Sequence, residues 1–250
     1  MSPFGYGEPK LLDTPISAEV LGKRCAWYDK KEPSYNRSLA EYRTALRISV
    51  FDEESQRHLD LSAHGQSTLL IELLLNPWGC RLPKLESQHR ATALDQVEAW
   101  WCGLDADVLP TVSDRLAADG TCLAQYAPVF RDLSERSVRV GGDSHTWGPV
   151  AASKTLYVLR PHFFLAWDTN IRKALGRPHG TAEDYVHFLE QARVRLNELA
   201  PDDESLKALQ KEISQPSCTA AEMLNKYCWS MTRKKKGGSW IDPDLDGASG

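Results

Sequence analysis

Apolar residues along this chain recur mostly at intervals of three and four positions, which is the period of an α-helix. One apolar stripe runs through residues 35–50, and a longer apolar run over 67–75 ends at Asn76-Pro77-Trp78-Gly79. The strict alternation that is typical of a half-buried strand is nearly absent. The spacing therefore predicts an all-α fold, in which helices pack on helices around a shared core.

Start and stop signals divide the rest of the chain into further expected helices. A proline after Arg160 stops a helix that begins near Val150, and Gly176 ends a short helix that begins at Asp168. Thr181-Ala182-Glu183-Asp184 resembles a capping box that opens a helix to Leu199. We also expect helices over 85–102, 111–118, 122–133, 203–214 and 218–230.

At 250 residues the chain is long enough to bury a sizeable core. Residues 1–34 carry several prolines and glycines and little periodicity, so they are expected to form an irregular N-terminal arm. We expect residues 35–232 to form one helical domain of two lobes with a cleft between them. Residues 233–250 are expected to form a basic and then acidic tail.

The sequence also limits the cellular context and the cofactors. No apolar run approaches the roughly 18 residues of a membrane span, and the N-terminus lacks the features of a secretion signal. The six cysteines are scattered and form no C-x-x-C pair, which argues against zinc and iron–sulfur sites. We therefore expect a cytoplasmic protein with reduced thiols, no metal, no cofactor and no membrane partner.

The net charge of −4 does not by itself indicate a nucleic-acid partner, but the charge is unevenly distributed. Residues 131–177 hold eight Lys or Arg against four Asp or Glu, and 233–236 are all basic. We expect these two segments to form one positive face, with the acidic helix from Thr181 pointing away. For the cluster at 233–236, a solvated charge run is the competing interpretation.

Asp168 is the first candidate catalytic residue. It begins a helix directly after the apolar run 163–167, where an aspartate commonly caps the helix by accepting backbone N–H bonds. The same N–H donors and the helix dipole favour the ionised carboxylate. A fixed carboxylate beside a cleft can stabilise positive charge that develops on a sugar ring, as cleavage of an N-glycosidic bond requires.

Lys154 is the second candidate, and it lies near the start of the preceding helix among apolar residues. Such a lysine can extend its ammonium to solvent or pair with a carboxylate. A partly buried lysine can also act as a nucleophile that forms a Schiff base. A structural ion pair between Lys154 and Asp168 is therefore an open alternative to a catalytic pair.

Two segments resemble the core of the helix-hairpin-helix DNA glycosylases. These are Ser153-Lys154-Thr155-Leu156 and Trp167-Asp168-Thr169-Asn170-Ile171-Arg172-Lys173-Ala174-Leu175. The resemblance implies a two-lobed helical bundle, with Asp168 as the essential aspartate and Lys154 as the Schiff-base lysine of the bifunctional members. It also implies double-stranded DNA with a modified base as the partner.

The resemblance, together with the charge pattern, suggests further DNA-binding residues. Upstream, residues 69–76 resemble the helix that leads to the family's wedge loop, which assigns Asn76, and with it Trp78, to the gap left by a flipped base. Aromatic residues near the site are candidates for stacking on that base, chiefly Trp147, Tyr157 and Trp167. The other expected DNA contacts are Arg81, Asn170, Arg172, Lys173, Lys234 and Lys235.

The chain also departs from the family pattern. The family's hairpin carries a Gly-x-Gly, whereas residues 146–154 hold a single glycine, and Lys154 precedes Asp168 by only 14 residues. A divergent DNA glycosylase is the function that we expect, and removal of hypermodified phage bases in anti-phage defence is a specific possibility. The alternatives are a non-catalytic all-α DNA-binding protein and a helical scaffold in which Lys154 and Asp168 form a structural ion pair.

Overall fold

The computed structural model describes residues 11–83, 87–105, 107–117, 122–139 and 145–233, and within them the fold is all-α. No sheet forms in these ranges, and the single β-bridge joins Ser137 to Thr146. The helical elements in chain order are α1 (Ala18–Lys31), α2 (Pro33–Leu46), α3 (Glu53–Arg57), α4 (His64–Leu69), the π-helix η1 (Leu70–Leu75), α5 (Arg90–Cys102), the 3₁₀ turn η2 (Leu123–Gln125), α6 (Tyr126–Glu135), α7 (Gly148–Leu159), α8 (Thr169–Ala174), α9 (Ala182–Leu199), α10 (Asp203–Glu212) and α11 (Ala220–Met231).

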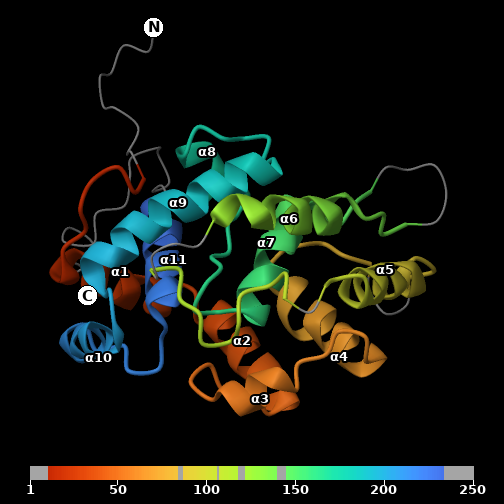
Figure 1. Ribbon diagram of the computed structural model, residues 1–250, viewed down its shortest axis with the longest axis horizontal. Coiled ribbons are helices and arrows are strands. Elements are labelled where there is room, and N and C mark those ends of the chain that lie inside the picture. The colour runs from red at the N-terminus through yellow and green to blue at the C-terminus, as the bar shows by residue number, and fades with distance from the viewer. Residues whose placement is uncertain (1–10, 84–86, 106, 118–121, 140–144, 234–250) are drawn as a thin grey trace, which may run out of the picture.

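Helix α7 lies at the centre of the molecule (Figure 1). Every side chain from Ala151 to Leu159 is buried, as expected for a helix that is covered on all sides. Helix α6 packs against α7 and α9, and α11 packs against α1, α8 and α9. The start of α7 is preorganised by Gly148, whose φ of +77° suits a glycine, and by Pro149 in the first turn.

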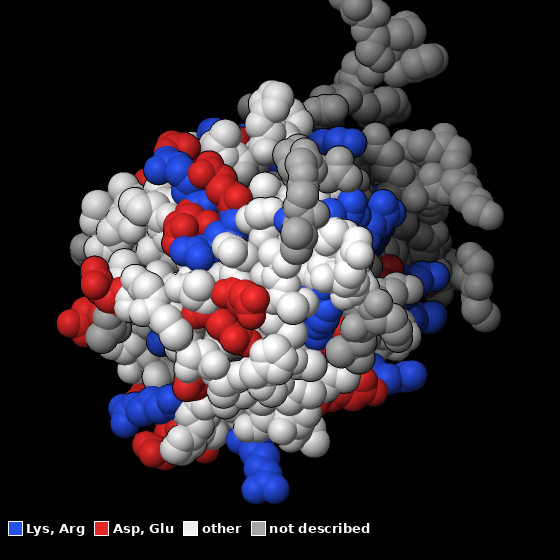
Figure 2. Space-filling view, turned by 90° about the vertical axis from the view of Figure 1, so that its right-hand side faces the viewer, with Lys and Arg blue, Asp and Glu red and all other residues white. Residues whose placement is uncertain are grey.

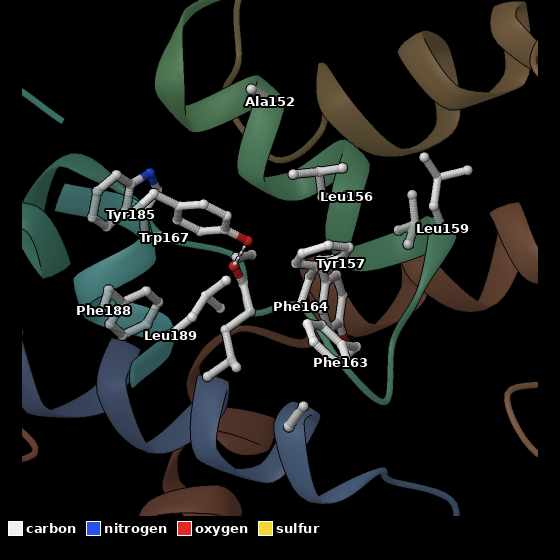
Figure 3. Packing of buried hydrophobic residues seen from close by; sticks show 14 of the residues in the cluster. Ala152, Leu156, Tyr157, Leu159, Phe163, Phe164, Trp167, Tyr185, Phe188 and Leu189 are labelled. Carbon is white, nitrogen blue, oxygen red and sulfur yellow. Dashed lines mark hydrogen bonds between the residues drawn. The ribbon is translucent and has the colours of Figure 1, made fainter. Parts of the chain in front are cut away.

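An aromatic cluster anchors the segment that leads into α8 (Figure 3). Trp167 stacks on Phe188 of α9, with ring centroids 5.7 Å apart and an interplanar angle of 18°. Tyr185, also on α9, stacks on Phe130 and donates a hydrogen bond to the Leu165 carbonyl oxygen at 2.9 Å. Because Trp167 and Tyr185 are both fully buried, these contacts hold the backbone just before Asp168 rigidly to the core.

The all-α expectation is confirmed, and most of the expected helices exist within a few residues of the expected bounds. The irregular arm expected over 1–34 is wrong for residues 18–31, which form α1. Ser17 caps this helix, and Leu21, Cys25 and Tyr28 are its buried residues. The helix expected over 111–118 is also absent from the described residues 111–117, and the short helix α3 was not anticipated.

Within the described part of residues 131–177, acidic partners interrupt the positive face that we expected. Arg131 and Arg177 pair with Glu183 and Asp184 in the first turn of α9, so this acidic helix lies against the basic segment instead of pointing away. Arg136 pairs with Asp132. In the upper left part of Figure 2, basic and acidic side chains lie next to one another. Local pairing thus neutralises much of the positive charge that the composition suggested.

The six cysteines are all free, and none of the described helices is both long and apolar enough to cross a membrane.

Candidate active site

A pocket of about 570 Å³ opens where the ends of several helices meet. Its size falls in the ~300–1,000 Å³ range of small-molecule sites. The wall is built from α1, α2, the loop 78–81, the start of α7, the segment 166–171 and α11. Its polar and aromatic lining comprises Tyr28, Tyr35, Trp78, Cys80, Arg81, Trp147, Lys154, Trp167, Asp168, Thr169, Asn170, Asn225, Trp229 and Arg233.

Asp168 lies at the pocket edge as the N-cap of α8. Its Oδ1 accepts hydrogen bonds from the backbone N–H groups of Asn170 and Ile171, both at 2.8 Å. The other oxygen, Oδ2, has no protein donor within the described residues. One oxygen therefore fixes the carboxylate in place while the other stays available to a ligand or a water molecule.

Lys154 reaches the same pocket from α7 and is 9 % exposed. Its Nζ donates a hydrogen bond to the Trp78 carbonyl oxygen at 2.5 Å and lies 5.7 Å from the centre of the Trp78 ring. No ion pair joins Lys154 to Asp168, although both belong to the described part of the chain. The structural ion pair considered as an alternative is therefore absent, and the two charges face a shared pocket.

A hydrogen bond next to both candidates fixes their relative positions. Ser153, the neighbour of Lys154, accepts the backbone N–H of Trp167 through its Oγ at 3.1 Å. The same hydroxyl donates to the Val150 carbonyl oxygen at 3.0 Å. Trp167 adds a bond from its indole N–H to the Pro149 carbonyl oxygen at 3.2 Å. Because Trp167 directly precedes Asp168, these bonds tie the start of α8 to α7.

Aromatic side chains form one wall of the pocket. Tyr35 lies between Trp78 and Trp229, with ring centroids 6.2 and 6.1 Å away, and Tyr28 meets Trp229 edge to face at 5.0 Å. The indole N–H of Trp78 donates to the Tyr35 carbonyl oxygen, which fixes that ring. Burial raises the pKa of the Tyr28 hydroxyl, and burial together with nearby Glu32 raises that of Tyr35. Both tyrosines therefore stay protonated at neutral pH, and the wall is uncharged.

Positive charge surrounds the rest of the pocket. Arg81 is exposed at its edge, and the Arg233 guanidinium stacks 3.7 Å from the centre of the Trp229 ring. The first turn of α7 also lines the pocket, and the amides of a first turn lack partners within their helix. Asp168 supplies the carboxylate among these groups. The arrangement suits a ligand that combines a planar ring with negative charge.

The pocket collects seven of the residues proposed from the sequence: Trp78, Arg81, Trp147, Lys154, Trp167, Asp168 and Asn170. Trp147 and Trp167 are almost fully buried, so each exposes very little surface to the pocket.

Other proposed residues lie elsewhere. Asn76 is partly buried and accepts the Leu82 N–H at 2.8 Å, so it closes the loop 76–82 instead of projecting towards a ligand. Tyr157 is fully buried in the core beside Trp78. Arg172 does not line the pocket: its side chain is 8 % exposed and donates to the carbonyl oxygens of Pro178 and His179, so its proposed DNA contact stays a prediction.

Three further residues proposed for DNA binding are on the surface or outside the described chain. Lys173 is exposed on α8 but does not line the pocket. Lys234 and Lys235 lie outside the described residues. For these three, the proposed contact stays a prediction.

The sequence did not point to Tyr28, Tyr35, Asn225 and Trp229, which complete the pocket from α1, α2 and α11, together with Arg233 of the basic cluster. Tyr28 and Trp229 are separated by about 200 positions, and no local pattern reports their contact. The structure adds one signal: the π-helix η1 ends at Leu75, shortly before the loop 78–81, and such helices often lie next to functional sites.

No protein-family model matches the chain, and comparisons with curated proteins and with solved structures find no significant match.

Proposed function

We propose that this protein is a DNA glycosylase, which takes a modified base out of the duplex and cleaves its N-glycosidic bond. The observation that carries the proposal is the position of Asp168 at the edge of an aromatic pocket, as a capped carboxylate whose Oδ2 meets no donor from the described residues. Extruded bases are held by stacking between aromatic side chains, and Tyr35, Trp78 and Trp229 supply such a wall.

The reaction that fits this arrangement breaks the bond between C1′ of the sugar and the base nitrogen. The bonding electron pair leaves with the base, and positive charge develops on the sugar ring. The Asp168 carboxylate would stabilise that charge at short range, because its position is already fixed by two backbone N–H groups. A water molecule then adds at C1′, and the proton that it loses passes through Asp168 to the departing base.

The geometry favours hydrolysis by water over attack by Lys154. Its Nζ is held by the Trp78 carbonyl oxygen and faces the Trp78 ring, so attack on C1′ requires this contact to break. We therefore propose that the enzyme is monofunctional and that Lys154 contributes positive charge near the phosphate backbone. Arg81 and Arg233 at the pocket edge would contribute in the same way.

An abasic-site assay tests the proposal. Duplexes that contain alkylated, oxidised or deaminated bases, and phage DNA with hypermodified bases, are incubated with the protein and then treated with alkali. Strand breaks that appear only after alkali, on a subset of these substrates, are the expected result. DNA binding without breaks on any substrate would favour a non-catalytic DNA-binding protein. If the protein neither binds DNA nor produces breaks, the proposal is contradicted.

A further inference from the structure

Asn225 lies on α11, in the pocket wall. Among the described residues, Asn225 and Asn170 are the two whose carboxamide side chains line the pocket. Its Oδ1 is buried and has no hydrogen-bond partner. Its Nδ2 also makes no hydrogen bond within the described residues. Among the buried, unpaired side-chain atoms of the described residues, only Asn225 Oδ1 and Arg233 Nε belong to residues that line the pocket. Of these two atoms only Oδ1 is an acceptor, so it can take a hydrogen bond from a ligand in the pocket.

Asn225 is well placed to meet a planar ring. Trp229 follows it by one helical turn on α11 and also lines the pocket, and α8, which Asp168 caps, packs against α11. A ring that stacks on the aromatic wall would present its edge, not its face, to a neighbouring carboxamide. A carboxamide offers an acceptor and a donor side by side, which matches the paired donor and acceptor on the edge of a nucleobase.

We propose that Asn225 is the specificity-determining residue of the pocket, and that it reads the hydrogen-bonding edge of the extruded base. Oδ1 accepts a ring or amino N–H, and Nδ2 donates to the adjacent ring nitrogen or carbonyl oxygen. The proposal rests on the proposed function, since it takes a base as the occupant. A base whose edge N–H is missing or alkylated should bind the pocket weakly, because it would leave Asn225 Oδ1 buried and unpaired.

The experiment measures binding of free nucleosides by quenching of tryptophan fluorescence, since Trp78, Trp147 and Trp229 line the pocket. Two matched pairs are used: thymidine with N3-methylthymidine, and deoxyadenosine with purine 2′-deoxyriboside. The first pair probes the imide edge and the second the amino edge. In at least one pair the blocked nucleoside should bind the wild-type protein about 5- to 150-fold more weakly, the range of a bidentate base contact.

Asn225→Leu, which keeps the side-chain size, should abolish this discrimination. Asn225→Asp keeps an acceptor and loses the donor, so it should weaken binding but retain the preference, and it covers the case in which Asn225→Leu does not fold. Asn197→Leu is the matched control, because Asn197 is half-buried on α9 and lies outside the pocket lining. It should behave as wild type.

Unchanged discrimination in Asn225→Leu, or nucleoside binding by the wild type without discrimination in either pair, would overturn the role of Asn225. In both cases base release from DNA by the wild type would leave the proposed function standing. If the wild type binds no nucleoside and releases no base, the pocket is not a nucleobase site, and the proposed function fails together with this inference.

Discussion

Replacing Asp168 by asparagine should separate the structural role of this residue from its chemical role. An asparagine Oδ1 can accept the same two N–H bonds, from Asn170 and Ile171, that Asp168 accepts at 2.8 Å. The variant loses only the favourable interaction of a negative charge with the N-terminus of the six-residue helix α8, which is worth about 0.3–1 kcal/mol. For a chain of this size the melting temperature should fall by about 1–4 °C.

The effect on catalysis should be far larger. A preorganised charge that faces the transition state typically contributes a factor of about 10²–10³ to the rate, so single-turnover base release should fall at least that much. Asp168→Ala should be equally inactive but less stable by about 1–2 kcal/mol, because it leaves two amides of α8 without an acceptor. Differential scanning fluorimetry and quenched-flow base release measure the two quantities.

Asp202 provides the matched control. It caps α10 through a hydrogen bond from the Ser205 N–H at 2.8 Å and lies outside the pocket lining. Asp202→Asn should change stability slightly and leave base release unaltered. If folded Asp168→Asn released base at the wild-type rate, Asp168 would be a helix cap only, and the catalytic assignment would be refuted.

Three further predictions concern Lys154, Arg172 and the lysines at 234–236. Borohydride should trap no covalent adduct between the wild-type protein and DNA, because the Trp78 carbonyl oxygen holds the Lys154 ammonium. An adduct that forms with the wild type but not with Lys154→Gln would contradict this expectation. Arg172→Ala should lower the free energy of unfolding in urea by roughly 2–3 kcal/mol, because it removes a buried side chain and the hydrogen bonds that its charged guanidinium donates to the carbonyl oxygens of Pro178 and His179. DNA affinity should stay the same, and a selective loss of affinity would support the DNA contact instead. Replacing the lysines at 234–236 should reduce the slope of log affinity against log salt by up to about 3, and an unchanged slope would identify a solvated tail.

The sequence carried most of the information on local structure. The helical spacing of apolar residues, the capping residues and the stop signals predicted α7, α8 and α9, because all three signals depend on residues within one or two turns of each other. The same locality explains why Asp168 and Lys154 were found together: they lie 14 positions apart, on helices joined through Ser153. Helix α1 was missed because the prolines and glycines that precede it outweighed the spacing of Leu21, Cys25 and Tyr28.

Long-range contacts were not accessible to the same reasoning. The aromatic wall needs Tyr28, Tyr35 and Trp229 to meet, and that depends on how α1, α2 and α11 pack. Charge was misread for the same reason, since a count along the chain cannot show that Arg131 and Arg177 meet the carboxylates of α9. Arg172 belongs to a motif that suggested DNA binding, yet burial turned its guanidinium towards backbone carbonyl oxygens.

We propose that the carboxylate of Asp168 drives release of a base from DNA. Mass spectrometry of the free base, with abasic sites counted in the same samples, tests it most directly. Wild-type protein should release one base per abasic site from at least one class of modified duplex, and folded Asp168→Asn should release at least about a hundredfold less in the same time. Equal release by both proteins, or abasic sites without free base, would contradict the account.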